Sequence, residues 1–520
     1  MVSFDGVLII EQHPPTVSVV VWKDDNGHIW AAKYNEKYDK WDRISKGESG
    51  IDDAEVIQKA IDVVGEQDGG LVKINSGTYL IDKTINMKNR VILSGNNTIF
   101  KLNKEVVCVN CDGEQNSENG WMNCGIENII FDGNGNKYKS PLLLLHHIGQ
   151  ISPDFNEPTF FRDLTFRNHG GFVIRMIGQT SNIVDISNIN VTNSAGRYTF
   201  TARDGSTQLC PIFHLIPDDN NGHVTDIHIT NSHFEYKNGP LLYSDYLVDE
   251  RLYAYSTGIY FTDCHIETSP DLSVVQPDMA YVFRGGVLNR LTLSNVLIAH
   301  TQSPGIPIID IEHMNSLLIS NTQITNPSPL IKFGWLGYAN IDAYIMNVGT
   351  PTINDIMIRT NNILSNSGDA LIGSKISLNI TPYFDENNIF TVGICRDTTI
   401  NIYFGDGIKK SKINITNIQN SGNIYTFGDC IGINNEGILT IKGDGTTTTF
   451  TVSTQHNLIT DDPSKILVTA TPSKSCQVEY NLVDNDGDGF KETLQFTLTF
   501  TTAPASGEII YLSWNANVIM

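Results

Sequence analysis

A short pattern of apolar and polar residues recurs along most of the chain. Two apolar residues are separated by one residue, and an asparagine or aspartate follows two positions after the second, as in Val184-x-Ile186-x-Asn188. The alternation predicts a strand with one buried face. The final Asn or Asp predicts a turn, because these side chains tolerate left-handed backbone dihedrals. Other copies end at Asn168, Asn231, Asp263, Asn295, Asn321 and Asn417, with a slipped copy at Asn361. Their unequal spacing predicts a coil of similar rungs joined by loops of different length.

Composition narrows the class of protein. The chain has 520 residues, of which 40% are hydrophobic and 18% are charged, so it is globular and large enough for several cores. The net charge of −22 makes nucleic acid an unfavourable partner. We expect no membrane insertion, because no apolar run is long enough to span a bilayer. We also expect no ordinary secretory signal, because no basic segment precedes the first apolar run.

The first part of the chain predicts a small β unit and then a helix. Residues 1–47 contain two apolar strands that flank Asp24-Asp25-Asn26-Gly27, a hairpin-turn sequence. A helix is predicted over 52–65, with Asp52 as its cap and Glu55 completing a capping box. An amphipathic helix just before a strand coil would cover the open end of the first rung.

Residues 48–440 are predicted to form the coil. The alternating segments within 441–520 are longer and predict an antiparallel β-sandwich.

The start of the coil resembles a known superfamily. The motifs are the helix sequence 54–62, Gly69-Gly70-Leu71-Val72, Gly77-Thr78-Tyr79 and Val91-x-Leu93-x-Gly95. They resemble the entry of the pectin-lyase-like right-handed parallel β-helix superfamily, which includes polysaccharide lyases, glycosidases and viral tailspikes. The resemblance covers about 50–440 and implies an all-β fold with an N-terminal cap helix. One such fold hosts many functions.

The flanking segments resemble modules of tail-fibre-like proteins of archaea, their viruses and proviruses. The segments are VVVWKDDNGHIWAAK and the run from Gly443-Asp444-Gly445-Thr446 to Ser513-Trp514. The resemblance implies a homotrimeric attachment protein on a virion surface. Its partners would be tail or capsid proteins and host-surface glycan. The alternatives are a polysaccharide depolymerase, either a glycoside hydrolase or a lyase, and a purely structural spike.

A polar ladder is predicted on one face of the coil. The strands upstream of the repeated pattern are FVIRMIG (172–178), IFHLIPDD (212–219), LYAYS (252–256), YVFRGG (281–286) and IPIIDIEH (306–313). Equivalent positions of successive rungs lie about 4.8 Å apart, so their outward residues would line up. These residues are Arg175, His214, Tyr255, Arg284, and Asp310 or Glu312, and the adjoining loops add Asp218, Asp219, His223, Asp245, Asp249, Glu250 and Arg251. Such side chains suit the binding of polysaccharide, because sugars present both hydroxyls and apolar faces.

Asp218 and Asp219 are the candidate catalytic pair, because glycoside hydrolysis uses two carboxylates. The surrounding Asp-Asp-Asn-Asn-Gly sequence equally predicts a solvated turn. The Asn-Thr-Asp and Arg-x-Lys patterns of family-28 glycosidases are missing from the sequence.

Asp484, Asp486 and Asp488 form a D-x-D-x-D-G sequence, which predicts a structural Ca²⁺ site. A plain hairpin turn is the alternative.

Three cysteines lie close together in sequence, at Cys108, Cys111 and Cys124, with His146 and His147 beyond them. A zinc site, a disulfide and buried thiols are all compatible with this spacing.

Overall fold

A computed structural model gives the fold of the chain. It describes all residues except 1, 5–6, 10–18, 36–37, 39, 117–119, 150–158, 179–183, 217–223, 225, 237–238, 246–257, 269–281, 301–307, 326–330, 347–357, 361–374, 381–389, 393–398, 405–412, 416–421, 428–435, 456–457, 460–465, 484–492 and 519–520. The chain divides into two units, one of residues 1–314 with 322–324 and one of 315–321 with 325–520. Within the described part, no helix is long and apolar enough to cross a membrane.

The N-terminal segment forms antiparallel strands. β1 (Val2–Phe4) pairs with β2 (Val7–Ile9), and β3 (Val19–Lys23), β4 (His28–Asn35) and β5 (Lys40–Glu48) form a meander. The predicted hairpin turn is confirmed, and Asp24 accepts the backbone N–H groups of Asn26 and His28. Burial raises the pKa of Asp24, but hydrogen bonds from His28 and Trp30 outweigh it and lower this pKa to about 2. β3 also pairs in parallel with the first rung of the coil.

Helix α1 (Asp53–Gly65) caps the coil with one apolar stripe, but its predicted capping box is wrong. Asp52 is the N-cap residue, yet its carboxylate accepts the backbone N–H of Glu48 at 2.7 Å and makes no cap bond. Glu55 instead pairs with Lys83 at 2.8 Å. The backbone of Asp52 has φ −103° and ψ 11°, outside the extended region typical of side-chain capping.

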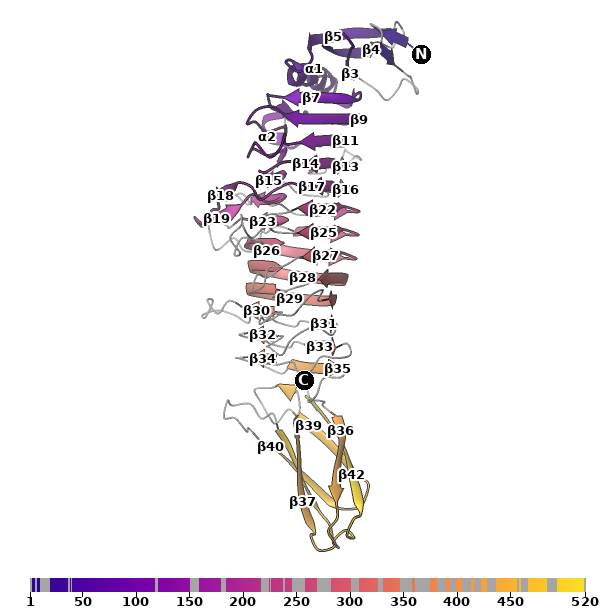
Figure 1. Cartoon of the computed structure of the whole chain (residues 1–520), viewed down its shortest axis with the longest axis vertical. Coiled ribbons are helices and arrows are strands. Elements are labelled where there is room, and N and C mark those ends of the chain that lie inside the picture. Colours follow the sequence, from indigo (N-terminus) through magenta and orange to yellow (C-terminus); the bar gives the residue numbers. More distant parts are fainter. Residues whose placement is uncertain are drawn as a thin grey trace. The chain divides into compact units, whose positions relative to one another are not determined.

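In the first unit the strand pairings form three parallel ladders, called here the first, second and third sheets, and the strands of successive rungs stack on one another (Figure 1). The first sheet contains β8 (Ile85–Asn86), β10 (Val109–Asp112), β12 (Leu143–His146), β15 (Ile174–Ile177), β20 (Phe213–Ile216), β23 (Leu242–Ser244), and the starts of β26 (Phe283–Ser294) and β28 (Ile309–Thr325). The second contains β6 (Gly70–Ile74), β13 (Thr159–Arg162), β16 (Val184–Ser187), β21 (Ile227–Thr230) and β24 (Gly258–Thr262). The third contains β7 (Gly77–Ile81), β14 (Thr165–Arg167), β17 (Asn190–Thr192), β22 (His233–Tyr236), β25 (His265–Thr268) and β27 (Leu297–His300).

Two long strands, β9 (Val91–Leu102) and β11 (Gly125–Asp132), run through both the second and the third sheet. The second unit has parallel pairs of its own, formed by β29 (Ile331–Met346), β30 (Ile358–Thr360), β31 (Lys375–Ile380), β32 (Phe390–Val392), β33 (Thr399–Phe404), β34 (Ile413–Ile415) and β35 (Gly422–Phe427). This is the parallel β-helix that the sequence predicts.

The recurrent asparagines and aspartates occupy left-handed turns, as predicted. Between the second and third strands they are Asn97, Asn128, Asp163, Asn188, Asn231, Asp263, Asn295 and Asn321, with φ between 46° and 57°. Asn188 Nδ2 donates to Asp163 Oδ1 of the preceding rung at 3.0 Å, so these side chains also stack. Asn168 and Asn193 mark a different turn, after the third strand, and Asn193 donates to Asn168 at 2.9 Å. Asn361 and Asn417 lie outside the described residues.

The inside of the coil is filled by stacked apolar side chains. Phe131 lies between Phe100 and Phe166 of neighbouring rungs, with ring centroids 5.9 and 5.0 Å away. All are fully buried, and each buried Phe contributes about 1.5–3 kcal/mol. The cysteines Cys108, Cys111 and Cys124 are also buried and free. Buried thiols are therefore confirmed, and the disulfide alternative is wrong.

The C-terminal segment has two three-stranded antiparallel sheets. One contains β36 (Glu436–Lys442), β42 (Ile509–Val518) and β39 (Ile466–Pro472), and the other contains β37 (Thr449–Gln455), β41 (Thr493–Thr499) and β40 (Gln477–Val483). A short strand, β38 (Leu458–Ile459), pairs with β35. Phe496 and Trp514 come from different sheets and lie in one core, with ring centroids 6.2 Å apart. The segment is thus a β-sandwich.

Candidate functional site

The predicted polar ladder exists on the outer face of the first sheet. The strand register aligns Arg175 with His214, His214 with Tyr243, and Tyr243 with Arg284. The residues on either side of Arg175 in β15, Ile174 and Met176, are buried in the coil, so the ladder side chains point outward. The prediction that Arg175, His214 and Arg284 share one face is therefore confirmed as geometry.

One rung of the ladder was assigned wrongly from the sequence. β23 occupies the rung between β20 and β26 that the sequence assigned to LYAYS, and Tyr243 takes the position predicted for Tyr255. Tyr255 itself lies outside the described residues. The signal that identifies β23 is the apolar run Leu241-Leu242-Tyr243 directly after Gly239-Pro240. From the sequence the strand was assigned to the second run of large residues, at 252–256, because the composition of both segments predicts a strand.

The sequence left Asp310 and Glu312 as alternatives for the next position. The backbone N–H of Phe283 donates to the carbonyl of Ile308 at 2.8 Å, the pattern that accompanies every parallel pair in this sheet. This bond places Arg284 in register with Asp310, so Asp310 continues the ladder. Glu312 lies two residues further on the same face and is partly exposed. We refer to Arg175, His214, Tyr243, Arg284 and Asp310 as the ladder row.

A hairpin covers the middle of the ladder row. Strands β18 (Thr199–Thr201) and β19 (Thr207–Leu209) pair antiparallel within the link from the third sheet to the next first-sheet strand. Phe200 of the hairpin lies 4.7 Å from His214 and 5.2 Å from Tyr243, centroid to centroid. Both covered side chains are only 1% exposed. The prediction that His214 lines an open groove is therefore wrong, because the hairpin supplies an apolar cover.

Under the hairpin lie the buried side chains of His214 and Asp245, with the backbone of Arg203 above them and the partly exposed Arg175 beside them. His214 Nε2 is 3.6 Å from Asp245 Oδ2, and the backbone N–H of Arg203 donates to Asp245 Oδ1 at 2.9 Å. Burial lowers the pKa of His214 to about 4, although the Asp245 carboxylate opposes the shift. Burial also lowers the pKa of Arg175, whose guanidinium lies over the Phe172 ring. His214 is thus a neutral imidazole at neutral pH.

The ladder row stays accessible on both sides of the hairpin. Arg175 is partly exposed on one side, and Arg284 and Glu312 are partly exposed on the other. The open positions therefore combine guanidinium donors with a carboxylate acceptor. Such groups can hydrogen-bond sugar hydroxyls, and each such charged bond is stronger than a neutral one.

The remaining candidate residues lie outside the described part of the chain. They are Asp218, Asp219, His223, Asp249, Asp484, Asp486 and Asp488. The last three belong to the link between β40 and β41. These strands are direct antiparallel neighbours, and the register pairs Val483 with Thr493.

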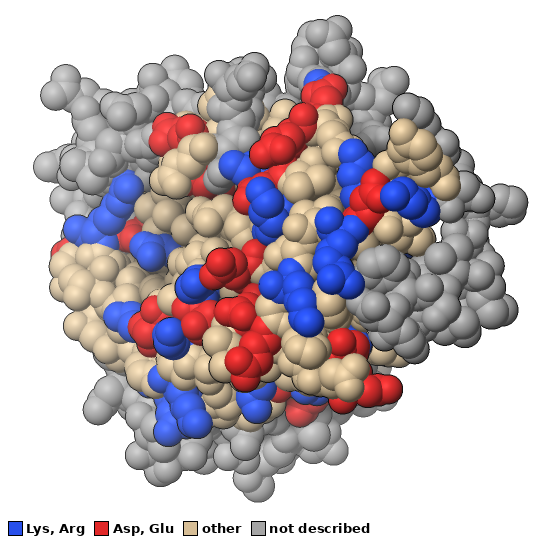
Figure 2. Space-filling model, turned by 90° about the horizontal axis from the view of Figure 1, so that it is seen from above, with Lys and Arg blue, Asp and Glu red and all other residues tan. Residues whose placement is uncertain are grey.

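Charge is mixed along the coil. Arg162 lies in register with Glu127 and pairs with it at 2.6 Å, and Arg167 pairs with Asp132 of the preceding rung at 2.8 Å. On the face seen in Figure 2, acidic and basic side chains are interspersed and do not gather into a patch of one sign. The arginine of each pair is exposed to solvent, which screens the charges, so each pair adds little stability.

The strand registers define a parallel β-helix protein. Its first sheet carries a row of polar side chains and a covering hairpin on the outer face. No protein-family model matches the chain, and no curated protein matches it. Among solved structures, it is similar to the tailspike gp49 of Pseudomonas phage LKA1, with 11% identity, 89% of this chain and 92% of that chain covered, and a TM-score of 0.44.

Two further solved structures are similar. The gp54 tailspike of Acinetobacter baumannii bacteriophage AP22, in complex with a capsular saccharide, has 9% identity, 89% and 93% coverage and a TM-score of 0.41. The A-module of the mannuronan C-5 epimerase AlgE6 of Azotobacter vinelandii has 13% identity, 73% and 97% coverage and a TM-score of 0.37. At such low identities and TM-scores, these similarities say nothing about the function of this chain. The fold assignment rests on the strand registers.

Proposed function

We propose that this chain is a glycan-binding spike whose first-sheet face holds an extended surface polysaccharide. The observation that supports this most is the ladder row, which places the partly exposed Arg175 and Arg284 on one face. Three rung steps separate these two arginines, a span of about 14 Å at 4.8 Å a step. Two donors this far apart can contact different sugars of one chain.

The buried middle of the row has a supporting role in this proposal. His214 and Tyr243 hold the hairpin through Phe200, and the hairpin exposes Arg203 and Asp204 beside the row. The binding surface then consists of Arg175, the hairpin tip and Arg284. His214 is neutral beneath this cover, since a charged imidazole would be costly to bury.

The proposal includes the setting that the sequence resemblance implies. The chain would be a homotrimer on a virion surface, joined to a tail or capsid protein through residues 1–47. Three copies would multiply weak sugar contacts into avidity. Light scattering of the purified chain tests the oligomeric state, and a monomeric mass at micromolar concentration would remove this part of the proposal.

The binding role is tested with Arg175→Ala and Arg284→Ala on an array of bacterial and archaeal surface polysaccharides. Each guanidinium donates charged hydrogen bonds, so each change is expected to weaken binding about 10- to 100-fold. Arg162→Ala is the matched control, because Arg162 is also an outward arginine but belongs to the second sheet. Array silence of the parent would favour a purely structural spike. Equal losses in all three variants would show that binding does not use the first sheet.

The depolymerase alternative is tested by incubating the parent chain with the polysaccharides that it binds. Release of oligosaccharides from a bound polysaccharide would show cleavage, and Asp218→Asn and Asp219→Asn would then be expected to abolish release while retaining binding.

A further inference from the structure

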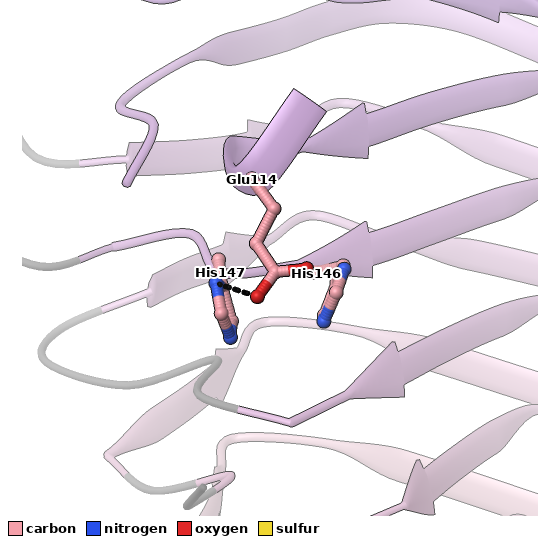
Figure 3. A group of neighbouring side chains, drawn as sticks. All are labelled: Glu114, His146 and His147. Atoms are coloured by element: carbon pink, nitrogen blue, oxygen red, sulfur yellow. Dashed lines mark ion pairs between the residues drawn. The ribbon is translucent and has the colours of Figure 1, made fainter. Parts of the chain in front are cut away.

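Three side chains with metal-binding chemistry gather at one end of the first sheet (Figure 3). Glu114 comes from the short helix α2 (Gly113–Asn116), His146 ends β12, and His147 follows it. One ligand atom from each lies within 4.8 Å of the others. The cluster is one rung from the ladder row, because Leu144 of β12 is in register with Arg175.

Adjacent residues of a strand normally point to opposite faces, so two neighbouring histidines would not share a site. Here β12 ends at His146, and His147 has a left-handed φ of 50°. This conformation breaks the alternation and brings both imidazoles together, with ring centroids 4.3 Å apart. Histidine is among the residues that adopt positive φ more readily than most. The sequence pair His-His at the end of a strand therefore becomes one cluster.

The distances suit a tetrahedral ion. Glu114 Oε1 is 3.3 Å from His147 Nδ1. Two ligands bound at about 2.0–2.1 Å on a tetrahedron are about 3.4 Å apart, so this pair needs almost no rearrangement. His146 has its Nδ1 3.2 Å from Asp112 Oδ1, which leaves its Nε2 for an ion. A carboxylate behind a ligating imidazole fixes the tautomer and the orientation of the ring.

The surroundings of His147 point the same way. Its side chain is only 10% exposed, and the Trp121 ring stacks on it at 5.4 Å. An imidazole held this firmly beside a glutamate is typical of a prepared ligand.

We propose that Glu114, His146 and His147 bind a divalent transition-metal ion of the Zn²⁺ type. Two imidazoles and one carboxylate suit Zn²⁺ and do not suit Ca²⁺, which needs six or more oxygens. Three protein ligands leave one position for water or for an oxygen of a bound molecule. The ligand set differs from the cysteine-based zinc site considered from the sequence, because Cys108, Cys111 and Cys124 are buried inside the coil. This site does not depend on glycan binding.

The test uses the full chain, freed of metal with a chelator and dialysed, and titrated with Zn²⁺ in a calorimeter. One equivalent of Zn²⁺ is expected to bind to the parent. Glu114→Gln and His147→Asn are expected to abolish this binding. Asp112→Asn is expected to weaken it about 10- to 100-fold. Asn is chosen at position 147 because it tolerates the left-handed backbone. Co²⁺ gives an independent readout through the visible absorption of a tetrahedral site.

The matched control is His265→Asn. His233, His265 and Glu267 form a second cluster of the same composition on the third sheet, and this variant is expected to leave Zn²⁺ binding unchanged. The proposal is overturned if the parent binds no Zn²⁺, if Glu114→Gln and His147→Asn both bind as the parent does, or if only His265→Asn loses binding. Should His147→Asn fail to fold, Glu114→Gln decides alone, because the Glu114 side chain is 56% exposed and its loss leaves no cavity.

Discussion

His214 and Asp245 face each other from neighbouring rungs, with Nε2 of the imidazole 3.6 Å from Oδ2 of the carboxylate, beneath Phe200 of the hairpin. Both side chains are almost completely buried. Burial nevertheless outweighs the carboxylate and keeps the imidazole neutral, with a pKa of about 4. Protonation of His214 would therefore place a charge under the apolar cover of the hairpin.

The first prediction concerns acid. The pKa of histidine in an unfolded chain is about 6.5, so between pH 6.5 and 4 the unfolded chain binds a proton at this position and the folded chain does not. Stability should therefore fall as the pH drops through this window, by up to about 3 kcal/mol, from 2.5 units at 1.36 kcal/mol each. Urea unfolding at pH 7 and pH 4.5 measures the loss.

His214→Leu should reduce that loss and leave the variant more stable than the parent at pH 4.5. A residual loss is expected, because burial also lowers the pKa of His169 to about 4. His228→Gln changes a partly exposed histidine of the second sheet and serves as the control. A pH dependence that is identical in the parent and in His214→Leu would refute the assignment.

The second prediction separates the hairpin from the coil. Phe200 packs on the outside of the coil, whereas Phe213 is buried within it. Phe200→Ala should increase amide exchange over 199–209 with little effect on global unfolding, because the hairpin is an addition to an intact rung. Phe213→Ala should lower the free energy of unfolding by about 3–5 kcal/mol. Hydrogen exchange with mass spectrometry distinguishes them, and a global effect of Phe200→Ala equal to that of Phe213→Ala would contradict this view.

The third prediction tests the left-handed turns. At Asn188, with φ of 52°, both Asn188→Ala and Asn188→Gly lose the side-chain bond to Asp163. Only alanine also bears the cost of the left-handed backbone, about 1–2 kcal/mol. Alanine should therefore destabilise the chain more than glycine does, even though glycine gives the unfolded chain more freedom. Denaturant unfolding of the two variants measures the difference, and equal stabilities would show that the turn imposes no backbone constraint.

The fold could be predicted from the sequence because the repeated pattern reports local physics. Two apolar residues separated by one residue predict a strand, and the Asn or Asp that follows, such as Asn188 or Asp263, predicts a turn. The stacking of the rungs follows from the repetition of this unit. The same reasoning predicted that Arg175 and Arg284 share a face, because register in a parallel coil is fixed by the buried positions.

The surface could not be predicted as well. The hairpin that buries His214 depends on how Phe200 packs against the outer face of the rungs that follow it, and no local pattern encodes that contact. Tyr243 was missed because two nearby segments had equal strand character. His146 and His147 were noted beside the cysteines, but their grouping with Glu114 was missed, because it requires a single left-handed residue at the end of a strand. Loops and insertions are where sequence periodicity stops carrying information.

The last prediction concerns calcium at Asp484, Asp486 and Asp488. Their segment lies outside the described residues and links β40 and β41, whose register brings Val483 opposite Thr493. Three carboxylates two apart in so short a link repel one another, and a bound Ca²⁺ would relieve this and stabilise the sandwich. Calcium at 100 times its Kd should raise the free energy of unfolding by about 2.7 kcal/mol.

Asp484→Asn combined with Asp486→Asn should abolish that gain and should itself stabilise the calcium-free chain slightly, because it removes the repulsion. Thermal unfolding in excess chelator and in added Ca²⁺ measures both effects. Asp444→Asn is unsuitable as a control, because the Asp444 carboxylate accepts the backbone N–H groups of Thr446 and Thr447 in its own turn. Glu479→Gln, an exposed change on β40, is the better match. A calcium response that survives in the double variant would place the ion elsewhere, and no response in the parent would leave the segment as an ordinary hairpin link.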